Sequence, residues 1–587
     1  MTRGRAWFPQ TGAIVRSTGR ALATKKRGPV DPLGGDPIAL AGRVVTMNGT
    51  FAVRDDAVVY LAKSGIVAVQ DRGQQPPAGF DGVAVLETGG TIFPGLIELH
   101  NHLAYDALPL WAPVPKLFNN RGQWPNHKEY RPLVSGPMTV LGSYRDAKGL
   151  YPFLPPLVRY VECKCLFGGV TTSQGVKLAS NAGIQRFYRG IVRNVEQTDD
   201  EDLPEAQARI PDFEAKDAKR FLARLKKENS CFLLHLSEGI TAQGDPLSPA
   251  RKHFLALEIA PGEWALNKAF TGIHAAGLLP EDFNVLATHR SSIVWSPLSN
   301  LLLYGGTARI EEAKKAGIDI GLGSDWSPTG SKNLLGEMKV AWLYSQETLN
   351  GDISARDVVA MATCNAARIL RWDGVLGSIE AGKRADLIVV DGALLDPYDT
   401  LIHAKETDLK LVMINGIARY GVSPLMQQLA PSDQTVRVGG ETRQLFLKQE
   451  TADPDVAQVS LSKASSMLAD AFQRIAQLAK ELEKPKPARA QRLLDAQAGP
   501  VWSLALDEIS SCGVELSPRL PFDGPGDFTG PERAPRVMAA SAPALSTILK
   551  PIDLDPLTVA DDRNFLQRIQ DQPNLPVGLK ANLHTLF

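Results

Sequence analysis

The stretch that decides the fold is Phe93-Pro94-Gly95-Leu96-Ile97-Glu98-Leu99-His100-Asn101-His102, an apolar run that ends in two histidines. Side chains two residues apart on a strand point to the same face, so His100 and His102 would project together from the end of a strand. The run is short and follows Gly89-Gly90, which is typical of a buried strand. A single His-x-His pair is only a weak indication of a metal site, so its meaning depends on the rest of the chain.

Three later stretches also end an apolar run in a side chain that can bind a metal. Cys231 to Glu238 contains His235 and places Glu238 three residues further on; Phe270 to His274 ends in histidine, and Gly317 to Asp325 ends in aspartate. In a (β/α)8 barrel the carboxyl ends of all strands meet on one face, where catalytic residues gather. The sequence therefore predicts an α/β fold, a TIM-like (β/α)8 barrel, with one site built from four strand ends.

The order and spacing of these stretches resemble the amidohydrolase superfamily, and most closely its one-metal branch of cytosine and guanine deaminases and triazine chlorohydrolases. Pro94 to His102 is similar to the first-strand motif of that family, His235-Leu236-Ser237-Glu238 to its fifth-strand His-x-x-Glu, and Gly323-Ser324-Asp325 to its eighth strand. Ile273-His274 and Trp295 to Asn300 resemble the sixth strand and the loop after the seventh. The resemblance extends from residue 37 to residue 425.

This resemblance implies one divalent metal ion, with zinc preferred over iron or manganese, held by His100, His102, His235 and Asp325. A catalytic metal activates water for attack on a trigonal carbon bonded to nitrogen. Asp325 would accept a proton from that water and Glu238 would deliver one to the leaving nitrogen. His274 would polarise the substrate or hold the water without binding the metal permanently, and Asn300 would line the pocket.

The expected activity is hydrolysis of a carbon–nitrogen bond other than a peptide bond. Deamination of an amino-heterocycle and opening of a cyclic amide both remain open, because the same site residues serve both reactions. Lys177 follows the second barrel strand and raises a two-metal alternative, although the His-x-x-Glu pattern favours one metal. A non-catalytic binding or assembly scaffold is a further alternative, but such a relative would be expected to have lost ligands. Four more histidines are read as structural or exposed: His253, His289, His403 and His584.

Composition narrows the classes of partner. The 587 residues contain 64 Lys and Arg and 64 Asp and Glu, so no net field attracts nucleic acid or an anionic membrane. No apolar run approaches the roughly 18 residues of a membrane span, and five cysteines in a chain of this length do not make a disulfide framework. We expect a cytoplasmic enzyme with a small-molecule substrate, without a nucleic-acid or membrane partner, and with a homo-oligomer left open.

The flanking segments complete the expected organisation. Residues 1–36 form a basic arm that is expected to be disordered. Short strands in 37–90 and 376–425 should build one small β-sandwich beside a barrel of 91–375. The long aromatic loop 104–150 is expected to act as a lid or substrate wall. Residues 426–587 have no counterpart in the resemblance; they are expected to contain a helix over 468–482 and a Pro/Gly-rich stretch over 516–556, and their role is open.

Overall fold

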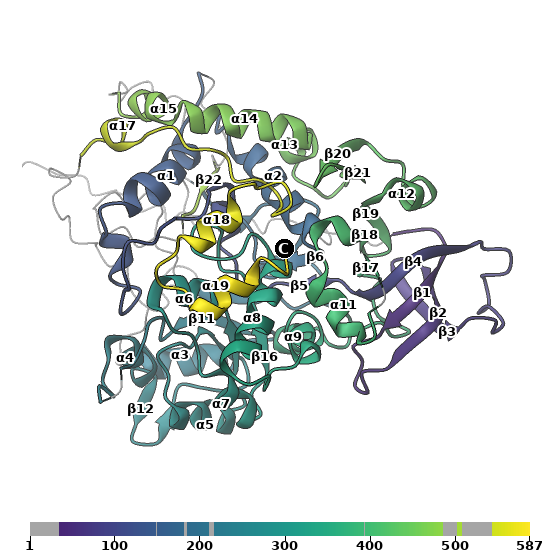
Figure 1. The fold of residues 1–587 in the computed structure, drawn as a ribbon, viewed down its shortest axis with the longest axis horizontal. Coiled ribbons are helices and arrows are strands. Elements are labelled where there is room, and N and C mark those ends of the chain that lie inside the picture. Colours follow the sequence, from purple (N-terminus) through teal and green to yellow (C-terminus); the bar gives the residue numbers. More distant parts are fainter. Residues whose placement is uncertain are drawn as a thin grey trace, which may run out of the picture.

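The computed structural model describes residues 34–147, 150–180, 185–209, 217–242, 244–392, 394–484, 502–506 and 543–587. The expectations for the basic arm up to residue 33, and for residues 516–542 of the Pro/Gly-rich stretch, lie outside these residues. Figure 1 shows the described chain with the N-terminal strands at one end and helices around the central parallel strands.

The centre of the molecule is a set of eight short parallel strands arranged in two hydrogen-bonded sheets. Both sheets follow the order of the sequence. The first sheet contains β5 (Leu96–Ile97), β6 (Val170–Ser173) and β9 (Arg193–Asn194), and the second contains β10 (Gln207–Arg209), β11 (Phe232–Leu236), β14 (Phe270–His274), β15 (Ser292–Trp295) and β16 (Ile320–Leu322).

Isolated backbone hydrogen bonds join the two sheets at both seams. Leu99 N, just after β5, donates to Leu322 O at the end of β16 over 3.3 Å, and Ala206 N donates to Val195 O over 2.8 Å between β9 and β10. In the described residues these seams do not form continuous ladders. The expected (β/α)8 barrel is therefore confirmed as an α/β fold with eight parallel strands in barrel order, but not as a closed hydrogen-bonded barrel.

Helices follow the strands and cover their outer side (Figure 1), and some of them begin at a side-chain cap. α8 (Leu334–Thr348) begins where the Asn333 side chain accepts a hydrogen bond from Gly336 N. α9 (Ala355–Met361) begins with a capping box between Ser354 and Asp357, as the sequence predicts for Ser354. Further helices are α2 (Leu154–Phe167), α5 (Pro280–Thr288), α6 (Pro297–Tyr304), α7 (Ile310–Lys315) and α10 (Cys364–Leu370).

Strands from both flanks of the parallel core pair into one sheet of nine strands. The strands expected for a sandwich are thus hydrogen-bonded side by side, and β20 and β21 extend the sheet beyond residue 425. Its order is β20 (Gln434–Val438), β21 (Glu441–Leu445), β19 (Ile417–Val422), β18 (Leu409–Ile414), β17 (Leu387–Asp391), β4 (Val85–Pro94), β1 (Ile38–Val45), β2 (Val53–Ala62) and β3 (Gly65–Asp71). β4 runs directly into β5, so this sheet fixes the strand that leads to His100.

The C-terminal extension packs back onto the core. The expected single helix is two helices, α14 (Leu461–Gln473) and α15 (Ile475–Leu482), because Arg474 leaves the helical conformation between them. α14 contacts α2, and near the C-terminus α19 (Val577–Leu583) contacts α8. The yellow segment in Figure 1 also contains α18 (Phe565–Gln570). Every helix in the described ranges is too short or too polar to cross a bilayer.

Candidate active site and metal centre

The side chains singled out at the strand ends come together in one cluster. His100 and His102 follow β5, His235 lies in β11, His274 ends β14 and Asp325 follows β16. Asp325 Oδ1 lies 3.0 Å from His100 Nε2 and 3.3 Å from His102 Nε2. Nε2 of His235 lies 3.3 Å from Nε2 of His102. Ligand-type atoms from residues that are far apart in sequence therefore face a common centre.

The hydrogen bonds of His100 fix the tautomer of its ring. Its Nδ1 lies 3.2 Å from Gln174 Oε1, an oxygen that also accepts from Asn101 N over 3.0 Å. Because an amide oxygen can only accept, Nδ1 carries the proton and Nε2 carries the lone pair. That Nε2 is buried and has no hydrogen-bond partner in the described part of the chain, yet it faces Asp325. The residues present thus fit a bound cation.

The protonation states of the cluster also suit a divalent ion. Burial, reinforced by the neighbouring histidines, holds the pKa of His235 well below its ordinary value, so its ring is neutral. Burial opposes ionisation of Asp325, but positive charge beside it, from the imidazoles or from a bound cation, holds its pKa well below the usual range. Neutral imidazoles with one carboxylate are the ligands expected for zinc, iron or manganese.

The backbone at the site is held in unusual conformations. Asp325 has φ 67° and His274 has φ 70°, in the left-handed region that few non-glycine residues adopt. Each such residue costs roughly 1–3 kcal/mol and persists only where its surroundings determine it. At Asp325 the N–H donates to His100 O over 3.0 Å, and His102 N donates to Asp325 O over 2.6 Å. These two bonds join the ends of β5 and β16 and fix three of the candidate ligands together.

His274 differs from His100 in the nitrogen that it presents. Asn300 Nδ2 donates to His274 Nδ1 over 3.1 Å, and Thr307 Oγ1 donates to Asn300 Oδ1 over 3.3 Å. Since Nδ1 accepts, the proton of the neutral ring is on Nε2, which lies 3.7 Å from Glu238 Oε2. His274 thus offers an N–H to the centre, although its position would also allow it to join a metal cluster.

Glu238 is a buried carboxyl group with a perturbed pKa. Burial raises its pKa to about 7, against the opposing effect of Arg121. Tyr304 OH donates to Glu238 Oε1 over 2.7 Å, and Arg121 lies 3.7 Å from Oε2. Trp124 Nε1 in turn donates to Tyr304 OH over 2.9 Å. A carboxyl group that titrates near neutral pH can give and take protons under physiological conditions.

Several of these partners were not predicted from the sequence. Tyr304 ends α6, and Arg121 lies in the loop after β5, far from Glu238 in sequence. Ser299, whose Oγ donates to Asp325 Oδ2 over 2.6 Å, is in the Trp295–Asn300 stretch, and Gln174 follows the second barrel strand. The position of Gln174 directly after β6, and of Ser299 at the start of the helix that follows β15, was an available signal, whereas Tyr304 and Arg121 carried none.

Lys177 and the four remaining histidines of the sequence analysis lie apart from this cluster. Lys177 stands on β7 (Lys177–Ser180), with its ammonium group 6.0 Å from the centre of the Phe187 ring. His403 contacts Asp399 O and the Trp342 ring, and His584 is exposed. His253 and His289 lie in or beside helices α4 (Pro249–Leu255) and α5, partly exposed.

Aromatic side chains from the long loop and from the end of β16 cover the site. The Trp326 ring lies 5.5 Å from His102, 5.1 Å from Tyr105 and 5.6 Å from Trp124, while Tyr130 packs on Trp124 at 5.1 Å. Residues 104–130 thus form an ordered aromatic wall, which supports the expected role of this loop. All four aromatic rings are less than 10% exposed, so the wall also shields the centre from solvent.

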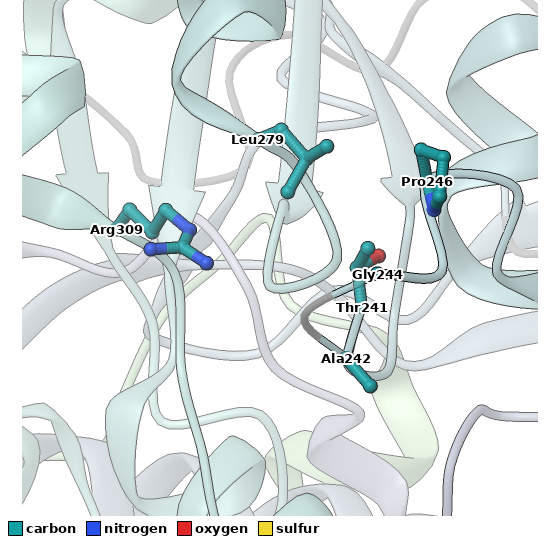
Figure 2. Close-up of a pocket in the computed structure, with 6 residues that line it drawn as sticks. All are labelled: Thr241, Ala242, Gly244, Pro246, Leu279 and Arg309. Carbon is teal, nitrogen blue, oxygen red and sulfur yellow. The ribbon is translucent and has the colours of Figure 1, made fainter.

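A pocket of about 400 Å³ opens in the neighbouring strand-end loops (Figure 2). It is lined by residues that follow β11 and β14, including Thr241 and Leu279, and by Arg309 before α7. Thr241 comes three residues after Glu238, so the pocket lies on the same side of the strands as the cluster. None of the clustered histidines or carboxylates lines it.

Comparisons with known proteins agree with the geometry. The Amidohydrolase family model matches residues 248–418. A 5-methylthioadenosine/S-adenosylhomocysteine deaminase of Moorella thermoacetica is 23% identical over 416 residues, covering 65% of this chain and 91% of that protein. The deaminase of the same name from Caldanaerobacter subterraneus subsp. tengcongensis is 35% identical over 154 residues, covering 24% of this chain and 35% of that protein.

Solved structures agree with the fold. A triazine hydrolase from Arthrobacter aurescens matches with a TM-score of 0.50 and 21% identity, covering 65% of this chain and 94% of that one. At this identity the likeness concerns the fold, which supports a TIM-barrel architecture. The match of residues 248–418 to the Amidohydrolase family and the relatives named as deaminases agree with the resemblance of the sequence motifs to deaminase-like members of the amidohydrolase superfamily.

Proposed function

We propose that this enzyme, a hydrolase of carbon–nitrogen bonds other than peptide bonds, deaminates an amino-substituted heterocycle with the help of one zinc ion. His100, His102, His235 and Asp325 would hold the ion. The observation that carries the proposal is the position of Glu238, a carboxyl group with a pKa of about 7, opposite the convergent histidines. The donor set supports a divalent ion, and the choice of zinc rests on its preference for few nitrogen and oxygen ligands with one open position.

Each side chain has a separate task in this scheme. A divalent ion at the centre would supply Lewis acidity and a water that deprotonates near neutral pH. Asp325 accepts the proton of the attacking water, since its carboxylate stays ionised beside the histidines. Glu238, in its protonated form, delivers a proton to the leaving nitrogen. His274 donates its Nε2–H to the substrate and is held in that tautomer by Asn300.

The aromatic wall favours a planar substrate. Trp326 lies beside His102 and Trp124 packs against Trp326, so a flat ring could stack on this wall while its amino-bearing carbon faces Glu238. The relatives named as 5-methylthioadenosine/S-adenosylhomocysteine deaminases would act on such an amino-heterocycle. We therefore favour deamination of an aminopurine-type compound over the opening of a cyclic amide.

The test is an ammonia-release screen of the zinc-loaded enzyme. The panel contains 5-methylthioadenosine, S-adenosylhomocysteine, adenosine, guanine and cytosine, with hydantoin and dihydrouracil as cyclic amides. We expect ammonia from at least one amino-heterocycle, and a loss of about 10²- to 10⁴-fold in kcat for Glu238→Gln with the metal retained.

His289→Ala is the matched control, because His289 lies outside the cluster beside α5 and should leave turnover unchanged. Ring opening of a cyclic amide without ammonia release would move the assignment to that reaction. Near-normal activity of Glu238→Gln would remove Glu238 from its proposed role in proton transfer.

A further inference from the structure

The C-terminal segment, residues 549–587, places the buried carboxylate of Asp555 against the core of the molecule. Asp555 is 1% exposed, and its two carboxylate oxygens lie 2.6 Å from Lys164 Nζ of α2 and 2.6 Å from Lys332 Nζ before α8. Asp562 lies 2.9 Å from the same Lys332. Two cations of the barrel are thus balanced by two anions of the C-terminal segment. Buried charges are tolerated only when paired in this way, so the pairing fixes where the segment docks.

Lys164 connects Asp555 to the loop that follows β16. Its Nζ also donates to Ser327 Oγ over 2.7 Å and to Asp106 O over 2.8 Å. Ser327 N donates to Asp106 Oδ1 over 2.8 Å. Ser327 follows the candidate ligand Asp325 by two residues, and Asp325 has the strained φ of 67°. A strained residue needs fixed surroundings, and Lys164 supplies part of them.

The same network reaches the loop that follows β5. Asp106 Oδ2 accepts a hydrogen bond from Asn101 Nδ2 over 3.0 Å, and this amide also donates to Glu98 Oε2 over 3.0 Å. Asn101 lies between His100 and His102 in the sequence. The hydrogen-bond network from Asp555 therefore reaches the two loops that carry His100, His102 and Asp325.

A second residue of the segment holds the start of the aromatic wall. Gln572 is fully buried; its Nε2 donates to Trp111 O and its Oε1 accepts from Val114 N, both over 2.9 Å. In addition, Asp555 N donates to Ala107 O over 3.0 Å. The C-terminal segment thus braces the loops on two sides of the site.

We infer that Asp555 is a positioning residue of the active site, acting through Lys164 on Ser327 and Asp106 to hold the loops that carry His100, His102 and Asp325. The inference rests on the proposed metal site. It gives a role to residues 549–587, which lie far outside the 248–418 stretch that the family model matches. Neighbours that orient ligands typically change metal affinity by about 10- to 100-fold when they are removed.

The test uses Asp555→Asn in the full-length enzyme. Asparagine keeps the shape and one acceptor but removes the charge opposite Lys164 and Lys332. At a temperature well below unfolding, we expect the bound zinc to pass to a chromogenic chelator about tenfold faster than in wild type. We also expect kcat to fall about tenfold while KM changes less than about twofold, because the catalytic loops shift while the aromatic wall stays anchored by Gln572.

Asn582→Ala is the matched control. Asn582 Nδ2 donates to Glu347 Oε1 over 2.7 Å and anchors the same C-terminal segment to α8, away from Ser327 and Asp106. This variant should release zinc and turn over substrate like wild type. If Asp555→Asn behaves like Asn582→Ala in both measurements, the segment only adds stability and the inference is wrong.

A double variant tests the route through Lys164. If Asp555 acts through Lys164, then Asp555→Asn should add less than about twofold to the effect of Lys164→Gln, whereas independent effects would multiply.

Should Asp555→Asn fail to fold, Ser327→Ala replaces it, because it breaks the hydrogen bond between Lys164 and Ser327 and leaves the Asp555–Lys164 pair in place. Zinc release from Ser327→Ala at the wild-type rate would then overturn the inference. If the wild-type enzyme holds zinc and releases ammonia while Asp555→Asn is unaffected, only this inference is wrong. If the wild-type enzyme binds no metal, the proposed function is wrong as well.

Discussion

At the scale of single residues, neighbours decide what each histidine can do. Gln174 keeps the proton of His100 on Nδ1 and leaves the Nε2 lone pair facing Asp325. Asn300 has the opposite effect on His274 and leaves an N–H facing Glu238. Two chemically identical side chains at different strand ends therefore present different groups to the centre, a lone pair from His100 and an N–H from His274.

Tyr304→Phe tests the tuning of Glu238. The Tyr304 hydroxyl donates to the carboxylate and so favours its ionised form, which lowers the pKa of Glu238. As an acid, Glu238 must be protonated, so kcat/KM should fall as pH rises through its pKa near 7. Loss of the hydroxyl should move that fall to higher pH, measured as a full pH profile of kcat/KM.

The matched control is Tyr344→Phe, because Tyr344 packs against Trp295 away from Glu238 and should keep the wild-type profile. A profile for Tyr304→Phe that stays in place or moves to lower pH would contradict the role of Glu238 as the acid.

At the scale of elements, the close approach of β5 and β16 sets the geometry of the site. A Cβ added to Gly323 would lie 2.5 Å from His100 Cβ and 2.6 Å from His100 O. Backbone cannot yield cheaply at such distances, so the two strand ends approach this closely only because residue 323 is glycine.

Gly323→Ala should therefore separate β16 from β5. We expect a loss of about 1–3 kcal/mol in the free energy of unfolding, as for overpacked cores, together with reduced zinc occupancy because His100 moves. Denaturant unfolding and elemental analysis measure the two effects. Gly374→Ala is the control, since its added Cβ meets nothing within 4 Å; equal zinc contents in both variants would contradict this account of the strand contact.

Strand ends and their clustering of candidate ligand residues could be predicted where the pattern is local. Apolar runs that end in His100, His235, His274 and Asp325 predicted strand ends, and the structure brings these four side chains together. The break at Arg474 and the seams between the two parallel sheets depend on tertiary packing, for which periodicity gives no signal. Tyr304 and Arg121 reach Glu238 only through loop paths that a sequence does not specify.

At the scale of the whole molecule, buried acids make stability depend on pH. Glu337 of α8 is fully buried between Ser331 and the start of α6, where its Oε1 accepts from Leu298 N over 2.9 Å. Burial raises its pKa to about 8. At pH values between the ordinary pKa of a glutamate and about 8, the folded protein keeps this proton and the unfolded chain loses it. The stability that Glu337 contributes therefore falls as pH rises through that range.

Glu337→Gln should remove this pH-dependent contribution to the free energy of unfolding. The variant keeps the acceptor for Leu298 N, and its free energy of unfolding should depend less on pH, by at most about 1.4 kcal/mol per pH unit for one proton. Denaturant unfolding of both proteins at several pH values measures the difference. Glu347→Gln, an exposed acid on the same helix, serves as the control; an unchanged pH slope in Glu337→Gln would mean that Glu337 is ionised in the folded protein.

Elemental analysis of the purified enzyme beside His102→Ala tests the metal centre most directly. One ligand set of three histidines and Asp325 predicts about one equivalent of a divalent metal, with zinc expected, and a large loss of it in the variant. Two equivalents would contradict the one-metal site and favour the two-metal alternative that involves Lys177. No bound metal in zinc-supplemented protein would contradict the account of the cluster as a catalytic metal centre.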